Sequence, residues 1–147
     1  MIVTANASDL ADILNLLVAC ELPTADLSPA QMESFLVLRR AKALLGMVGV
    51  QIYGQVGLLR SLAVRVGQRG RGWGSQLVRQ AEGYAHQQGV NELYLLTTSA
   101  EGFFARLGYH AIKRDQAPRP IQESAEFQSL CPASAALMRK ALPQIRP

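Results

Sequence analysis

Hydrophobic residues follow first a helical and then a strand-like spacing along the chain, and this change of period predicts a domain of mixed helices and strands. Residues 2–4 form a short apolar strand, and Asn6 or Ser8 is a suitable N-cap for a helix that runs to about residue 20. The expected apolar face of that helix contains Leu10, Ile13, Leu14, Leu17 and Val18. A loop over residues 21–29 should follow.

Dense β-branched and apolar residues predict the elements of the middle and the end of the chain. Strands are expected over residues 34–39, 43–53, 56–66, 92–98, 109–113 and 135–142. Helical spacing predicts helices over residues 72–88, 100–107 and 121–130. We therefore expect a mixed α/β domain, in the α+β sense that its sheet contains both parallel and antiparallel neighbours.

Length and composition indicate one folded domain that spans residues 1–147. The chain is 49% hydrophobic, so its core requires neither a disulfide nor a metal. Cys20 and Cys131 lie far apart in the sequence and do not have the spacing of a metal-binding pair, so we expect two free thiols and no metal. The longest apolar run, residues 43–50, is too short to span a bilayer, and we expect a cytoplasmic protein with no membrane partner.

The excess of positive charge has one local concentration. The net charge is +4, and Arg65, Arg69 and Arg71 are the only three arginines that lie within seven residues of the sequence. Nucleic-acid binding usually needs a longer basic surface, whereas a small cationic cluster beside glycines suits a phosphate-bearing small molecule. We therefore expect no nucleic-acid partner.

That cluster belongs to a glycine-rich turn between the strand that ends near residue 66 and the helix that begins near residue 72. Backbone N–H groups and the positive end of the helix dipole meet at such a turn, so it favours an anion such as a pyrophosphate. The dinucleotide-binding pattern fails because Ser75 stands where it requires glycine. The P-loop pattern fails because no lysine occurs between Lys42 and Lys113.

Two segments resemble the GNAT acetyltransferase superfamily. The run from Arg69 to Gly74, RGRGWG, follows LRSLAV at residues 59–64 and resembles the family's acetyl-CoA turn. The run from Gly102 to Tyr109, GFFARLGY, is similar to a later segment of the same family. The resemblance covers about residues 48–113. It implies a GNAT-like fold, with a mostly antiparallel central sheet of six to seven strands flanked by helices, and acetyl transfer from acetyl-CoA to an amine.

The resemblance also implies which residues bind acetyl-CoA. A main-chain amide near Leu62 would polarise the thioester carbonyl, and the amides of residues 69–75 would surround the pyrophosphate. Trp73 should also pack the following helix onto the sheet. The implied cofactor-binding residues are Leu62, Ala63, Val64, Arg69, Gly70, Arg71, Gly72, Trp73, Gly74, Ser75, Phe103 and Phe104.

The chain departs from the family at the two positions that usually carry acid–base chemistry. Many relatives have a glutamate where this chain has Gly57-Leu58, and many have a tyrosine where it has Phe104. The catalytic groups are therefore unassigned, and the remaining candidates are Glu21, Glu126, Tyr84 and Tyr94, although the helical and strand positions of both tyrosines favour a core role.

The tail and the loop at residues 21–26 resemble a GNAT subset that includes arsenic-resistance acetyltransferases and enzymes that act on glutamate. This second resemblance implies a small amino-acid-like amine, arsenic-containing or glutamate-like, bound between residues 21–29 and 58–62. Arg60, if it is not a plain exposed cation, and Arg119 could bind its carboxylate. Two alternative functions stay open: acetylation of a protein or peptide, and acyl-CoA binding without catalysis. The oligomeric state, monomer or homodimer, is also open.

Overall fold

A computed structural model describes residues 2–130 and 134–143 of the chain. Its strands are β1 (Ile2–Thr4), β2 (Phe35–Arg40), β3 (Ala43–Tyr53), β4 (Val56–Val64), β5 (Glu92–Thr97), β6 (His110–Ile112) and β7 (Ala136–Ala141). Its α-helices are α1 (Leu10–Ala19), α2 (Trp73–Gln87), α3 (Glu101–Arg106) and α4 (Arg119–Gln122). Shorter helical turns cover Ala7–Asp9, Pro29–Ser34, Val66–Gln68, Arg114–Gln116 and Glu126–Leu130.

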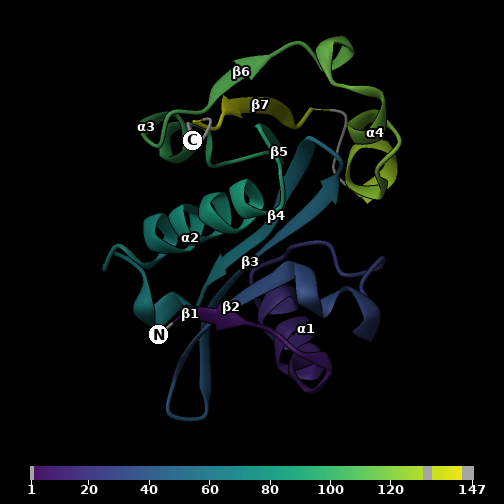
Figure 1. Ribbon diagram of the computed structural model, residues 1–147. Helices are drawn as coiled ribbons and strands as arrows, with labels where there is room; N and C mark the ends of the chain where they lie inside the picture. Colours follow the sequence, from purple (N-terminus) through teal and green to yellow (C-terminus); the bar gives the residue numbers. More distant parts are fainter. Residues whose placement is uncertain (1, 131–133, 144–147) are drawn as a thin grey trace.

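The strands form one sheet of seven in the order β1-β2-β3-β4-β5-β7-β6 (Figure 1). All neighbours are antiparallel except β4 and β5, which are parallel. Helix α2 lies in the crossover connection that joins these two parallel strands. The expected mixed, mostly antiparallel sheet flanked by helices is confirmed.

Alternate residues of the strands feed hydrophobic cores on the two faces of the sheet. On one face, Leu36 and Leu38 of β2 belong to the same core cluster as α2 and Phe104 of α3. On the other face, Phe35 and Val37 pack with α1. A third cluster joins Leu58, Tyr94 and Leu137 to Ile121 of α4, so α4 covers the face opposite to α2. Figure 1 shows α1 and α4 over different parts of the sheet.

Most predicted elements are confirmed with boundaries shifted by one or two residues. Asn6 is an N-cap as predicted, but of the short turn Ala7–Asp9 that precedes α1: its side chain accepts a hydrogen bond from the Ser8 amide at 2.9 Å, whereas Asp9 is the N-cap of α1 itself. Two details were wrong. Val18 is 66% exposed while Leu16 is buried, so the apolar face of α1 is rotated from the predicted one. Tyr84 is only half-buried and lies outside the core clusters.

The predicted helix over residues 121–130 was also wrong, because α4 ends at Gln122 and a separate π-helical turn covers Glu126–Leu130. The Ser124 hydroxyl donates to the Ile121 carbonyl at 2.6 Å and accepts from the Phe127 amide at 3.3 Å. These local bonds compete with a continuous helical ladder and divide the segment in two. The break aims Glu126 back toward the sheet, where its side chain is buried.

Candidate active site

The site originates where β4 and β5 separate. The two strands pair only from Val56 to Leu58 of β4 and from Glu92 to Tyr94 of β5, after which no pairing joins them. Beyond that point β4 contains a β-bulge, because its residues Ser61 and Leu62 together lie opposite the single residue Val48 of β3. Ser61 has a positive φ of +58°. The bulge and the separation leave main-chain groups of β4 outside the regular ladder, beside an open space.

That space is a cavity of about 1180 Å³. One wall is β4 from Leu59 to Val64, and the other is the end of β5 with the start of α3. The turn at residues 68–75 closes one end, the segment at residues 20–25 covers one side, and Glu126 lies at the other end. Since β4 rises about 3.3 Å per residue, the wall from Arg60 to Val64 is about 13 Å long, enough for an extended ligand.

We name the end formed by residues 68–75 the turn end. Gly70 and Gly72 have φ of +81° and +80°, a conformation that favours glycine, and Gly72 is the N-cap of the 15-residue helix α2. The first amides of α2 therefore face this end of the cavity without a side-chain cap. This arrangement suits an anionic group, as the glycine spacing predicted.

Two buried polar atoms at the turn end have no hydrogen-bond partner among the described residues. They are Nε1 of Trp73, a donor, and Oε1 of Gln68, an acceptor. Both residues line the cavity, and Trp73 also packs against the main core as predicted. Buried polar groups are normally paired, so these two atoms indicate a wall that a polar ligand completes.

We name the opposite end, formed by Arg60 and Glu126, the Arg60 end. The guanidinium of Arg60 binds Asp26 through both terminal nitrogens, with Nη2 to Oδ1 at 2.9 Å. Nη2 is also 2.9 Å from Oε1 of Glu126, and Nε donates to the Ser61 hydroxyl at 2.9 Å. The Arg60 side chain is 1% exposed, so it is a buried cation between two carboxylates and not a plain exposed one.

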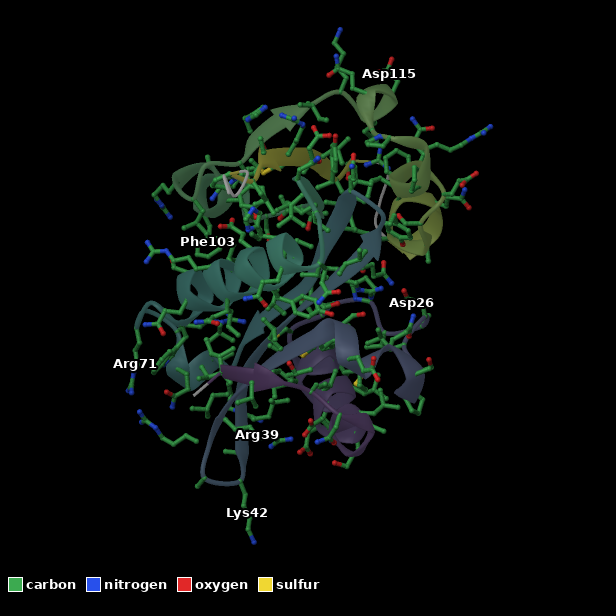
Figure 2. The ribbon with its side chains drawn as sticks, in the orientation of Figure 1. Asp26, Arg39, Lys42, Arg71, Phe103 and Asp115 are labelled. Atoms are coloured by element: carbon green, nitrogen blue, oxygen red, sulfur yellow. The ribbon has the colours of Figure 1, made fainter. Side chains whose placement is uncertain are left out.

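The cavity wall contains most of the residues that the resemblance implied for acetyl-CoA. Those that line it are Leu62, Ala63, Val64, Arg69, Gly70, Gly72, Trp73, Gly74, Ser75, Phe103 and Phe104. Arg71 is exposed and does not line the cavity, and Figure 2 shows it extending outward beside α2. Phe103 lies against Gly74, where an added Cβ would come within 3.2 Å of its ring. The two segments that carry the resemblance therefore meet in space.

The four acid–base candidates divide into two pairs. Glu21 and Glu126 line the cavity, the first exposed and the second buried. Tyr84 lies away from the cavity, with its hydroxyl 3.5 Å from the Glu33 carbonyl oxygen. Tyr94 is a buried core residue, as its strand position favoured, and burial raises the pKa of its hydroxyl. The two tyrosines therefore do not face the cavity.

Arg119 does not reach the cavity either. Its side chain is 88% exposed and lies 3.9 Å from the Glu123 carboxylate on the outside of the protein. Cys131 lies outside the described residues. Cys20 does line the cavity, and its sulfur accepts a hydrogen bond from Nη2 of Arg69 at 3.6 Å.

Residues 22–25 line the cavity and lie in the loop that was expected to bound the acceptor. The wall residues that were not predicted are Cys20, Gln68, Leu95 to Ala100 and Ala135. Leu95 to Thr97 belong to β5, which was predicted as a strand but not as part of the site. Asp26 was likewise missed as the partner of Arg60. A buried arginine in an apolar strand requires a carboxylate, so a partner could have been expected, but nothing in the sequence says which one.

The described residues contain no group of three or more His, Cys, Asp or Glu side chains arranged to hold a metal. In the same part of the chain, no helix combines the length and the apolar character needed to cross a membrane.

Comparison with known proteins agrees with the geometry of the cavity. The Acetyltransferase (GNAT) family matches residues 12–109, which include the bulge, the turn and α3. The chain belongs to this family. The GNAT match extends the predicted resemblance of residues 48–113 toward the N-terminus, through α1 and the segment at residues 20–25.

Individual relatives place the chain within the GNAT fold. An uncharacterised N-acetyltransferase of Chlorobaculum tepidum is 43% identical over 63 residues, which are 43% of this chain and 40% of that protein. The chain thus matches about two fifths of the length of this curated relative. N-acetylglutamate synthase of Neisseria gonorrhoeae, solved with coenzyme A and N-acetyl-glutamate, superposes with a TM-score of 0.87 at 19% identity over 98% of this chain and 35% of its own.

A protein of Mycobacterium tuberculosis, solved with CoA and a second ligand, has a TM-score of 0.81 at 19% identity. That match covers 97% of this chain and 99% of the other, so the two share their fold over almost their full lengths. At such identity the likeness shows the fold and leaves the acceptor to be argued from this chain's own residues.

Proposed function

We propose that this GNAT protein transfers an acetyl group from acetyl-CoA to the primary amine of a small amino-acid-like acceptor, including glutamate-like or arsenic-containing ones. The observation that carries the proposal is one continuous cavity. It runs from the turn end to the buried Arg60 end, along the stretch of β4 that no longer pairs with β5. The diphosphate of the donor would bind at the turn end, and its thioester would lie beside the bulge at Ser61 and Leu62.

The reaction needs an amine nitrogen that attacks the thioester carbonyl carbon. The C–N bond forms, the C–S bond breaks, the amine gives up a proton, and the CoA sulfur leaves as a thiolate that is then protonated. A main-chain N–H at the bulge, near Leu62, would stabilise the negative oxygen of the tetrahedral intermediate. Holding both reactants in one cavity supplies much of the rate by proximity.

The shape of the Arg60 end supports a small acceptor over a protein. Through Arg60, Asp26 of the segment after α1 is joined to Glu126 of the C-terminal segment across one face of the sheet. Together with residues 20–25, this bridge covers the approach to β4 on that face. A peptide backbone would need an open groove there, whereas a small amine would not.

The test is release of free CoA thiol from acetyl-CoA across a panel of acceptors, with acetyl-CoA binding recorded on the same sample. The panel contains amino acids, glutamate-like phosphinic and arsenic-bearing analogues, and lysine peptides. We expect turnover with small amines and none with the peptides. Turnover with peptides alone would contradict the small acceptor, and absence of acetyl-CoA binding would contradict the proposal as a whole.

Binding without turnover would instead support a non-catalytic acyl-CoA-binding module. Two observations favour keeping this second function. The stretch Gly57-Leu58, at the place of the usual glutamate, is buried and carries no carboxylate, and Phe104, at the place of the usual tyrosine, carries no acidic hydrogen. The chain must therefore take its acid–base groups from elsewhere or do without them.

A further inference from the structure

The free edge of β4 carries a main-chain acceptor close to the turn end. Successive residues of an antiparallel strand direct their main-chain groups alternately toward the neighbouring strand and away from it. The Arg65 amide donates to the Leu45 carbonyl of β3 at 2.8 Å, so Val64, the residue before Arg65, directs its N–H and C=O away from β3. Near the start of β4 that side is taken by β5, but this pairing ends at Leu58. The Val64 carbonyl therefore opens toward the cavity, which Val64 lines.

The side chain of Arg69 occupies this carbonyl. Nε of Arg69 donates to the Val64 oxygen at 3.1 Å, and Nη2 donates to Sγ of Cys20 at 3.6 Å. Cys20 and Arg69 both line the cavity and belong to different walls, the segment after α1 and the turn. The neighbouring Arg71, in contrast, extends outward beside α2 (Figure 2). The Arg69 side chain thus joins two walls of the cavity at the free edge of β4.

An extended donor would need the position that Arg69 holds. With the diphosphate at residues 69–75 and the thioester beside Leu62, as proposed above, the arm that connects them passes Val64. This arm of CoA contains amide groups, and an amide N–H is the usual partner of a carbonyl on a free strand edge. Binding of the donor would therefore displace Nε of Arg69 from the Val64 oxygen.

The displaced guanidinium would have a stronger partner at the same turn. Its partners in the structure are a carbonyl oxygen and a cysteine sulfur, neither of which is a carboxylate or a phosphate. Hydrogen bonds from a guanidinium to a phosphate are charge-assisted and about twice as strong as those between neutral groups. The exchange of Val64 and Cys20 for the donor diphosphate is therefore favourable for Arg69.

From these contacts we infer that Arg69 makes the site selective for donors that carry a diphosphate. Without a donor, the Arg69 side chain occupies the Val64 carbonyl, and with acetyl-CoA it moves to the diphosphate. An acyl-pantetheine without the diphosphate has to displace Arg69 and offers it no replacement. Arg69 is thus a specificity-determining residue of the donor site. This inference rests on the proposed function, because it requires acetyl-CoA in this cavity.

The experiment compares the binding of acetyl-CoA and S-acetylpantetheine to wild type and to Arg69→Met. Affinity for acetyl-CoA should fall by about tenfold or more, because the diphosphate loses a charge-assisted contact. Affinity for S-acetylpantetheine should rise by about threefold or more, because nothing competes for the Val64 carbonyl. Calorimetry measures the first affinity, and displacement of S-acetylpantetheine by CoA measures the second. Arg69 is exposed, so the fold should stay intact, which thermal unfolding verifies.

Arg65→Met is the matched control. Nε of Arg65 also donates to a main-chain carbonyl at 3.1 Å, that of Leu44, but Arg65 does not line the cavity. We expect this variant to bind S-acetylpantetheine as wild type does and to lose far less affinity for acetyl-CoA than Arg69→Met. A rise in affinity for S-acetylpantetheine that is equal in both variants would overturn the inference, because loss of any nearby cation would then suffice.

Arg69→Lys separates the charge of Arg69 from its contacts. Lysine keeps the positive charge, so this variant should bind acetyl-CoA more tightly than Arg69→Met. Equal affinities of the two variants would overturn the inference. So would an Arg69→Met protein that binds both donors more weakly, or one whose affinity for S-acetylpantetheine is unchanged, and these results leave the proposed function intact. If wild type does not bind acetyl-CoA at all, the proposed function fails and this inference fails with it.

Discussion

The two ends of the cavity are built in different ways. The turn end consists of main-chain amides, glycines and the start of α2, all within residues 68–75. The Arg60 end consists of side chains from three segments that lie far apart in the sequence, at Asp26, Arg60 and Glu126. A main-chain site recognises a phosphate whatever side chains surround it, whereas a side-chain site can change its ligand with one substitution. Under the proposed function, the donor site can therefore stay constant while the acceptor site varies.

The most severe test of this contrast is Gly72→Glu at the turn end. The substitution brings a carboxylate to the anion site and strains a position with φ of +80°. We expect affinity for acetyl-CoA to fall by at least about 100-fold, because like charges repel at short range. Binding can be measured by calorimetry.

Gly72→Ala separates the two causes, since it introduces the same backbone strain without the charge. Space is available for its methyl group, because no atom lies within 4 Å of an added Cβ. We expect this control to bind acetyl-CoA more weakly than wild type and far more tightly than Gly72→Glu. Unchanged affinity in Gly72→Glu would show that residues 68–75 do not bind the donor.

The second test breaks the Arg60 end by Arg60→Met. Methionine fills much of the same volume but leaves Asp26 and Glu126 together in a buried place without their cation. The loss should cost about 3–5 kcal/mol in the free energy of unfolding, as expected when one partner is removed from a buried ion pair. Denaturant unfolding measures this cost. A loss below about 1 kcal/mol would mean that the cluster is far better hydrated than its burial indicates.

The same contrast explains how much could be predicted from the sequence. The strand before the turn, the glycines from Gly70 to Gly74 and the helix after it are contiguous, so their spacing alone predicts an anion site. The arrangement of β4 beside β5 follows from the strand–helix–strand order. Only the anion site was predicted from these residues; the pairing of β4 with β5 is a finding of the structure that this order explains.

The Arg60 end could not be predicted, because its contacts depend on tertiary structure. Arg60 lies among apolar residues of a predicted strand, and this position favours burial of its side chain. Asp26, in contrast, lies in a loop whose sequence has no periodic pattern. Glu126 was placed on a continuous helix, and only the hydrogen bonds of Ser124 divide that helix and bring Glu126 to the sheet. Arg119 seemed equally suitable in the sequence but faces solvent.

The last and smallest expected effect concerns a second cluster of the same composition. Arg39 is also shared by two carboxylates, with Nη2 at 2.6 Å from Asp9 and 3.1 Å from Asp12, but its side chain is 24% exposed and that of Asp12 is 54% exposed. Because water screens this cluster, Arg39→Met should cost about 1 kcal/mol or less. A cost equal to that of Arg60→Met would show that burial does not distinguish the two clusters.

The pH dependence of that small effect has a definite sign. Burial alone would raise the pKa of Asp9, but the Asn6 amide and the Arg39 guanidinium that bind its carboxylate together hold the pKa below the ordinary value. The stabilisation is thus present above about pH 4 and is lost as the pH falls through the lowered pKa. The difference in unfolding free energy between wild type and Arg39→Met should therefore shrink below about pH 4, as acid unfolding curves would show. A difference that grows in acid would contradict the assignment of Asp9 as the charged partner.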